Sequence, residues 1–199
     1  MYIKKIILIV ISSFLCIAAG YVVVQNDKNI LEHTKSEQQT KKDINTKKEG
    51  WLIDYEEVYQ QSIQFQQPIM ANFTGSDWCG WCKKLKKAVF DTELFKEWAK
   101  NNVILFELDY PRRTPQDPEI QKQNRDLQQA FGGLVRGFPT VLYFNIERTF
   151  QENGSKDKDN ITLLPSTALV KSGQGRMGYM GDPNSFINKA DAIINATSN

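Results

Sequence analysis

The hydrophobic and polar positions divide this chain into three parts. Residues 6–24 form a mostly apolar stretch without a charge, whereas residues 25–50 are polar, mixed in charge and nearly free of large apolar side chains. From residue 51 onward, short apolar runs alternate with amphipathic segments. The pattern predicts a hydrophobic N-terminal segment (residues 1–24), a flexible polar linker (residues 25–50) and one folded domain (residues 51–199).

Within the folded part, the periodicity predicts strands that alternate with helices. Short apolar runs indicate strands at residues 69–74, 103–108, 140–145 and 167–171. Helical spacing and capping residues indicate helices at residues 54–64, 79–89, 92–100, 119–131 and 184–196. Proline content and polarity indicate loops at residues 110–118 and 151–165. This order of elements predicts an α/β sandwich, with helices on both faces of a central sheet.

The N-terminal segment has the features of an export signal. Lys4 and Lys5 precede the apolar stretch, which would span about 28 Å as a helix, close to the thickness of a bilayer core. Cleavage after Gly20 would make it a signal peptide, but the apolar run continues to Val24, which favours an uncleaved membrane anchor. We therefore expect the domain in a bacterial cell envelope, either anchored on the periplasmic side of the inner membrane or exported to the periplasm.

Composition and charge exclude several classes of protein. The formal net charge is only +2, and Lys4 and Lys5 account for it, so nucleic-acid binding is not expected. The single histidine, His33, lies in the predicted linker. The folded part consequently has no imidazole for base catalysis or metal binding, and we expect neither a metal nor an organic cofactor.

Two of the three cysteines form a C-x-x-C pair between a predicted strand and a predicted helix. Cys16 belongs to the N-terminal segment, and Cys79-Gly80-Trp81-Cys82 is the pair. The N-terminus of a helix stabilises a thiolate, so Cys79 would be nucleophilic near neutral pH, and Cys82, one turn later, could resolve a mixed disulfide. A zinc site lacks enough ligands, and Lys83 stands where a haem-attachment motif needs histidine. A purely structural disulfide remains the alternative.

The segment around the cysteines resembles a known family. Residues 74–85, TGSDWCGWCKKL, look like the active-site segment of the thioredoxin-like superfamily, especially its extracytoplasmic members from Bacteroidetes-type bacteria. A second segment, residues 135–144, VRGFPTVLYF, resembles the thioredoxin loop in which a cis-proline precedes a core strand. The resemblance covers residues 51–195 and implies a thioredoxin-like fold with a central mixed β-sheet.

The resemblance also assigns roles to individual residues. Cys79 and Cys82 would be catalytic, as a redox-active disulfide. Pro139 would pack against that disulfide, while the backbone at Phe138 would pair with an extended substrate peptide. Trp78 and Trp81 complete the expected substrate-binding set.

One position departs from the family pattern. Thioredoxins carry a buried aspartate beneath the cysteines that assists proton transfer, and the matching residue here is Asn72. Because an amide is not a general base, resolution by Cys82 would use water or a nearby lysine, Lys83 or Lys86.

The sequence therefore predicts an extracytoplasmic thiol–disulfide oxidoreductase, with net reduction favoured. Its partners would be proteins that carry thiols or disulfides, together with a membrane-embedded thiol electron donor. The rival interpretation is a redox-inert thioredoxin-fold binding or chaperone module whose disulfide is only structural.

Overall fold

The computed structural model describes residues 50–149, 158–164, 170 and 173–196. The predicted N-terminal segment and all but the last residue of the predicted linker lie outside this range, as does most of the strand predicted at residues 167–171. Within the described ranges, no helix is both long and apolar enough to cross a membrane.

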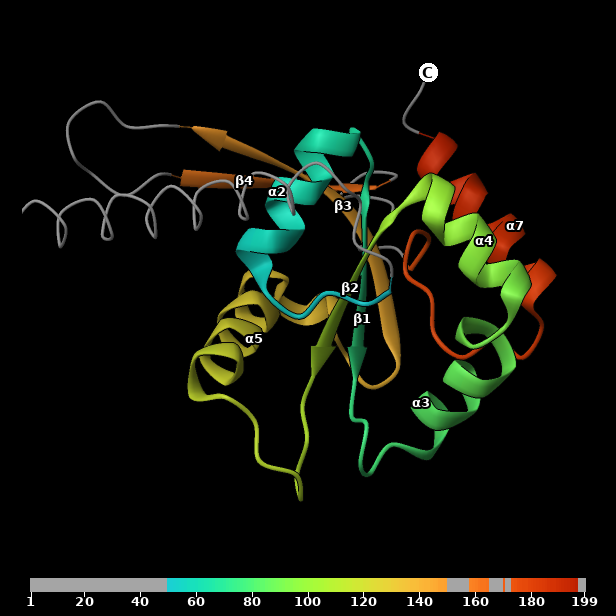
Figure 1. The fold of residues 1–199 in the computed structure, drawn as a ribbon, viewed down its shortest axis with the longest axis horizontal. Coiled ribbons are helices and arrows are strands. Elements are labelled where there is room, and N and C mark those ends of the chain that lie inside the picture. The colour runs from blue at the N-terminus through green and yellow to red at the C-terminus, as the bar shows by residue number, and fades with distance from the viewer. Residues whose placement is uncertain (1–49, 150–157, 165–169, 171–172, 197–199) are drawn as a thin grey trace, which may run out of the picture. The chain divides into compact units, whose positions relative to one another are not determined.

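Four strands form one mixed sheet in the order β2-β1-β3-β4. β1 (Ile69–Thr74) pairs in parallel with β2 (Ile104–Asp109) and antiparallel with β3 (Thr140–Thr149), which pairs antiparallel with β4 (Lys158–Leu164). Every residue of β1 is buried, as expected for a central strand that is covered on both faces. β1 and β2 therefore end at the same edge of the sheet, where β3 begins (Figure 1).

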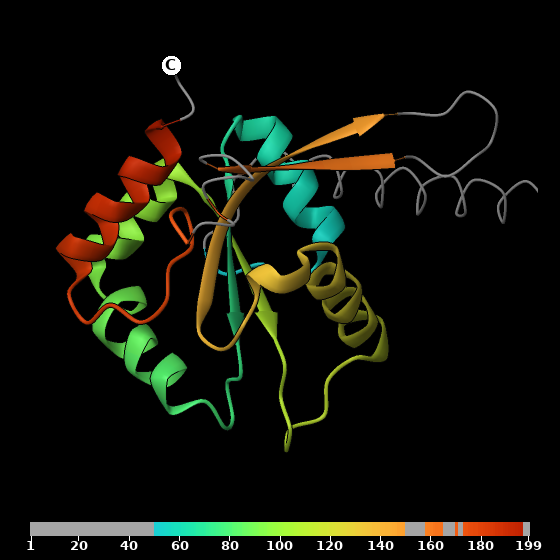
Figure 2. The ribbon, with the colours of Figure 1, turned by 180° about the vertical axis from the view of Figure 1, so that it is seen from behind.

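Helices cover both faces of the sheet. Figures 1 and 2 show α2 (Tyr55–Phe65) and α5 (Pro118–Ala130) on one side. On the other side lie α3 (Gly80–Leu85), α4 (Glu93–Asn102) and α7 (Pro183–Asn195). The predicted α/β sandwich is thus confirmed, with a thioredoxin-like arrangement of a mixed sheet between two helical layers.

Side-chain caps fix where the helices begin. A carboxylate or hydroxyl in each case accepts a backbone N–H of the first turn, which satisfies a donor that has no partner within the helix. The capping residues are Asp54 for α2, Thr92 for α4, Asp117 for α5 and Asp182 for α7. These short polar residues, followed by amphipathic stretches, are the reason that the helix starts could be predicted within one or two residues.

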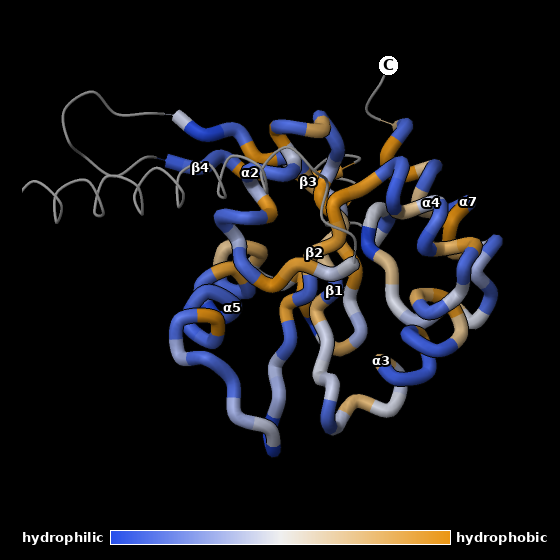
Figure 3. Tube along the Cα trace, in the orientation of Figure 1, coloured by the Kyte–Doolittle hydropathy of each residue, from blue (hydrophilic) through white to orange (hydrophobic). Residues whose placement is uncertain are grey.

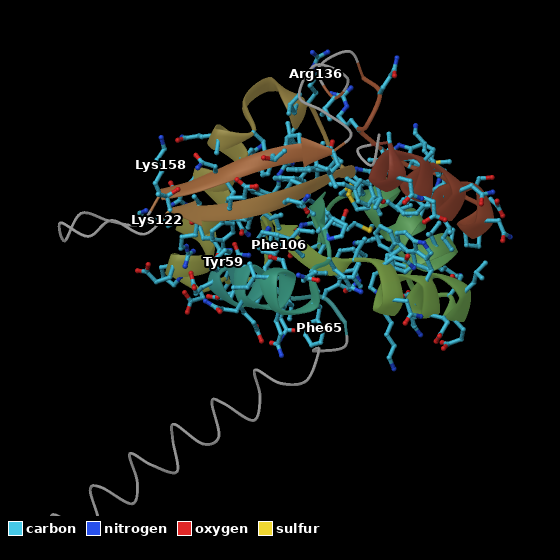
Figure 4. The ribbon with its side chains drawn as sticks, turned by 90° about the horizontal axis from the view of Figure 1, so that it is seen from above. Tyr59, Phe65, Phe106, Lys122, Arg136 and Lys158 are labelled. Atoms are coloured by element: carbon cyan, nitrogen blue, oxygen red, sulfur yellow. A yellow bond between two sulfur atoms is a disulfide. The ribbon has the colours of Figure 1, made fainter. Side chains whose placement is uncertain are left out.

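Two hydrophobic cores separate the sheet from its two helical layers. One includes Val58, Tyr59 and Phe106 between α2 and the sheet, and Figure 4 labels the last two of these side chains there. The other joins the opposite sheet face to α3, α4 and α7 through residues such as Leu85 and Phe186. Figure 3 shows the same division, since the central strands are mostly hydrophobic and the outer helix surfaces mostly hydrophilic.

The structure corrects the sequence prediction at two places. Residues 158–164, interpreted as part of a solvated loop, form strand β4, because a long β3 offers a partner with which this alternating segment pairs from Tyr143 to Thr149. The helix predicted from residue 79 is also irregular, since α3 continues directly into a π-helical turn, η1 (Lys86–Phe90).

Candidate active site

A disulfide lies at the start of α3, after the short loop that follows β1. The sulfurs of Cys79 and Cys82 are 2.07 Å apart and both residues are 5% exposed. Cys79 is the N-cap of α3, and the backbone N–H of Cys82 donates to its Sγ at 3.1 Å. When the pair is reduced, this donor and the positive end of the helix face the Cys79 sulfur, an arrangement that stabilises a thiolate.

The loop between β1 and Cys79 is fixed by hydrogen bonds to the end of β2. Ser76 donates its backbone N–H and its hydroxyl to the carboxylate of Asp109, at 2.8 and 2.5 Å. The backbone N–H of Cys79 donates to the carbonyl of Gly75 at 2.8 Å. The register that pairs Thr74 with Asp109 brings these groups together, so the parallel strand pair sets the position of the nucleophile.

Asp77 binds the loop that follows β2 to the active-site loop. Its carboxylate accepts the backbone N–H groups of Arg112, Arg113 and Thr114 at 2.6–3.1 Å. Partial burial acts to raise the pKa of Asp77, but these hydrogen bonds outweigh it and lower the pKa. The loop from Tyr110 to Arg113 is therefore attached next to the disulfide.

Trp78 connects three loops rather than projecting freely. Its Nε1 donates to the carbonyl of Tyr110 at 2.8 Å, and its ring meets that of Phe138 edge-on at 5.7 Å between centroids. The Arg112 guanidinium lies 3.7 Å from the ring centroid. A Cβ at Gly75 would lie only 2.4 Å from the indole, so glycine is required for this close approach.

Trp81, between the cysteines, is an exposed aromatic residue of the site. It is 56% exposed and packs on Tyr179, which is 41% exposed, with 5.0 Å between ring centroids. The ammonium group of Lys84 lies 4.3 Å from the Trp81 ring centroid. Sequence reasoning missed Tyr179, because the glycines around it indicated only turns.

The loop before β3 brings the proline segment to the site. The Phe138–Pro139 peptide bond is cis, as the resemblance implied. Pro139 is buried, and the half-buried Phe138 stacks on Tyr110 at 5.1 Å between centroids. Two residues after the proline, Val141 exchanges two backbone hydrogen bonds with Met177. This pairing carries the segment with Tyr179 past the proline and toward Trp81.

Two polar residues lie in the sheet on the face that α3 covers. Asn72 is 4% exposed, and its Oδ1 has no hydrogen-bond partner among the described residues. The register places Glu107 beside it on β2. Burial raises the pKa of Glu107, and the charge of Asp109 raises it further, while that of Lys86 opposes both.

The two lysines predicted to help Cys82 have other partners. The ammonium of Lys83 donates to the backbone carbonyl of Asp77 at 3.2 Å, and Lys86 forms an ion pair with Asp91. In the part of the chain that the structure describes, no cluster of three or more His, Cys, Asp or Glu residues is arranged to hold a metal ion.

Comparisons with known proteins agree with this geometry. The model of a thioredoxin-like family matches residues 50–145. Two relatives from Chlamydia pneumoniae, "Disulfide bond reductase DsbH" and "Thioredoxin-related protein DsbJ", are each 33% identical, over 93 and 97 residues. These matches cover 47% and 49% of this chain, but only 55% and 27% of the relatives' own lengths.

A solved structure shows the same arrangement over more of the chain. The structure titled "DsbH Oxidoreductase" superposes with a TM-score of 0.55 at 25% sequence identity, and the match covers 76% of this chain and 88% of that one. Fold, family model and cysteine spacing agree. Residues 50–145 are therefore similar to the thioredoxin-like family in sequence, in fold and in the spacing of the cysteines.

Proposed function

We propose that this protein is a thiol–disulfide oxidoreductase that acts on disulfides of other proteins. The observation that carries the proposal is the Cys79–Cys82 disulfide at the start of α3, beside the cis-proline loop and an exposed tryptophan. The printed names of the relatives, a disulfide bond reductase and a thioredoxin-related protein, support the same class of reaction.

The reaction transfers two electrons from the dithiol to the substrate. The Cys79 thiolate attacks one sulfur of the substrate disulfide, which forms a mixed disulfide and releases the first substrate thiolate. Cys82 then attacks the Cys79 sulfur, so that the intramolecular disulfide forms and the second substrate thiolate leaves. A dithiol donor must reduce the Cys79–Cys82 disulfide again before the next turnover.

The second step requires a group that accepts the Cys82 proton. Asn72 cannot serve, but Glu107 lies beside it on the neighbouring strand. Lys86, four residues after Cys82 and thus on the same helix face, interacts electrostatically with Glu107, so this carboxyl faces the helix that carries Cys82. A raised pKa suits a proton acceptor near neutral pH, and we assign this role to Glu107.

Net reduction is the proposed direction, and the cell envelope is the proposed location. The name of the relative DsbH supports the direction. The location rests on the apolar stretch behind Lys4 and Lys5, which would anchor the domain or direct its export. A reductase outside the cytoplasm needs a source of electrons, for which we propose a membrane-embedded thiol carrier.

A trapping experiment tests the proposal. In the Cys82→Ser variant, Cys79 can form a mixed disulfide but cannot release its partner. We therefore expect to isolate covalent complexes from intact cells, and we expect reducing agents to cleave them. The Cys79→Ser/Cys82→Ser double variant is the matched control and should capture none. Absence of trapped partners, together with a reduction potential below about −300 mV, would instead indicate a structural disulfide in a redox-inert module.

A further inference from the structure

The loop that follows β2 carries charge that the proposed reaction does not use. From the sequence alone, Arg112 and Arg113 have two interpretations, recognition of an anionic group and, as the favoured one, a solvated turn. In the structure, Asp77 holds the backbone of Arg112 and Arg113, and Trp78 holds the carbonyl of Tyr110. Arg112 is exposed, yet its guanidinium lies 3.7 Å from the ring centroid of Trp78, the residue next to Cys79. Its position beside the disulfide is therefore built by the fold.

A second cation lies over the other tryptophan of the site. Lys84 is exposed and its ammonium lies 4.3 Å from the centroid of Trp81, which separates the two cysteines. Each tryptophan of the site therefore carries one cation on its ring. We call the surface formed by Trp78, Trp81, Tyr179, Lys84 and Arg112 the active-site rim.

The described carboxylates near the rim form no ion pair with its two cations. Asp77 accepts backbone N–H groups, that of Arg112 among them, Asp109 accepts two hydrogen bonds from Ser76, and Asp91 pairs with Lys86. Within the described residues, neither Lys84 nor Arg112 forms an ion pair. Their positive charge is available to a molecule that approaches the disulfide.

We propose that the active-site rim selects protein disulfides whose cysteines are flanked by aspartate or glutamate in an extended segment. Trp81 and Tyr179 offer an exposed aromatic platform for such a segment, while Lys84 and Arg112 supply complementary charge over the rings of Trp81 and Trp78. Charges at the edge of an interface chiefly raise the rate of productive encounter and discriminate against like-charged partners. This inference rests on the proposed oxidoreductase function and names its substrate class.

Two matched peptides test the inference on the reduced full chain. Each is closed by one disulfide, and they differ only in whether glutamates or lysines flank the cysteines. Second-order rate constants for their reduction are each divided by the rate constant for the neutral 2-hydroxyethyl disulfide, which corrects for the reactivity of Cys79 itself. At low salt we expect the acidic peptide to react about tenfold faster than the basic one, and we expect about 1 M salt to remove most of this preference.

Variants then identify the residues responsible. The Lys84→Gln/Arg112→Gln double variant should lose most of the preference. The control Arg125→Gln/Lys189→Gln removes the same two residue types from exposed positions on α5 and α7, and should retain it. Equal rates for the two peptides, or an undiminished preference in the Lys84→Gln/Arg112→Gln protein, would overturn the inference. Failure to reduce any of the three disulfides would instead overturn the proposed function.

Discussion

The contact between Gly75 and Trp78 offers a direct test of how the active-site loop is built. A Cβ at position 75 would lie 2.4, 2.6 and 2.7 Å from the Cε2, Nε1 and Cζ2 atoms of the indole. These distances are too short for any real contact, and the atoms belong to a ring that is held on several sides. The Gly75→Ala substitution therefore has to displace either the ring or the loop.

The magnitude follows from what the displaced ring would lose. The hydrogen bond from Trp78 Nε1 to the carbonyl of Tyr110 is worth about 1 kcal/mol. The edge-on contact with Phe138 is worth about 0.5–1.5 kcal/mol, and the exposed contact with Arg112 about 0.5–1 kcal/mol. We expect Gly75→Ala to lower the free energy of unfolding by about 2–3 kcal/mol, at the upper end of the usual range for overpacking.

Urea unfolding of the oxidised protein, followed by far-ultraviolet circular dichroism, measures this difference. With a slope near 2 kcal/mol per molar urea, the midpoint should fall by about 1–1.5 M. Gly80→Ala is the matched control, because a Cβ at this position meets no atom within 4 Å and lies in the first turn of α3. We expect the control to be neutral or stabilising by up to about 1 kcal/mol. A Gly75→Ala protein with the wild-type midpoint would refute the steric reasoning.

Three further substitutions test the electrostatic and polar features of the domain. The hydroxyl of Tyr143 is buried without a hydrogen-bond partner among the described residues. Tyr143→Phe should therefore raise the free energy of unfolding, measured by urea titration, by about 1 kcal/mol. A loss of stability would show that the hydroxyl has a partner. Burial raises the pKa of Glu107, so the folded state binds the proton of this carboxyl more tightly than the unfolded state does. The stability that this proton contributes is lost as the pH rises from the unfolded pKa, about 4.3, through the folded pKa. Glu107→Gln should therefore gain stability relative to wild type as the pH rises from about 4 to 7 in a series of urea titrations, whereas a constant difference would contradict this assignment. Arg148 binds Asp159 and Glu56 and lowers the pKa of both carboxyls. Arg148→Ala should therefore lower the free energy of unfolding by about 1–2 kcal/mol near pH 7, and this loss should shrink as acid protonates the two carboxyls. An equal loss at about pH 3 would exclude the ion pairs as its cause.

Features that depend on local sequence could be predicted without the structure. Asp54 and Asp182 mark helix starts because each residue accepts a first-turn N–H close to it in the chain. The strand at residues 69–74 was correctly predicted because its apolar run is continuous. The position of the cysteine pair at the start of a helix follows from the same local order of elements. In each of these cases the physical cause lies within a few residues of the feature itself.

Features that depend on pairing between distant segments could not be predicted. β4 is a polar, alternating segment that becomes a strand only because the extended β3 supplies hydrogen-bond partners. Tyr179 reaches the site because Met177 pairs with Val141, some 36 residues earlier in the chain. No nearby residue signals either event.

Asn72 and Glu107, the two polar residues on the sheet face that α3 covers, also depend on pairing between distant segments, and here the pairing decides the chemistry of the site. From the sequence, Asn72 marks the absence of a carboxyl below the cysteines, and lysines of the following helix become the candidates for proton transfer. The register between β1 and β2 changes this interpretation, because it sets Glu107 directly beside Asn72 on the same face of the sheet. A shift of one residue in this register would turn the carboxyl to the opposite face, among the side chains packed under α2 and α5. The acid–base chemistry of the site thus depends on strand pairing across 35 residues, and the C-x-x-C motif alone does not specify it.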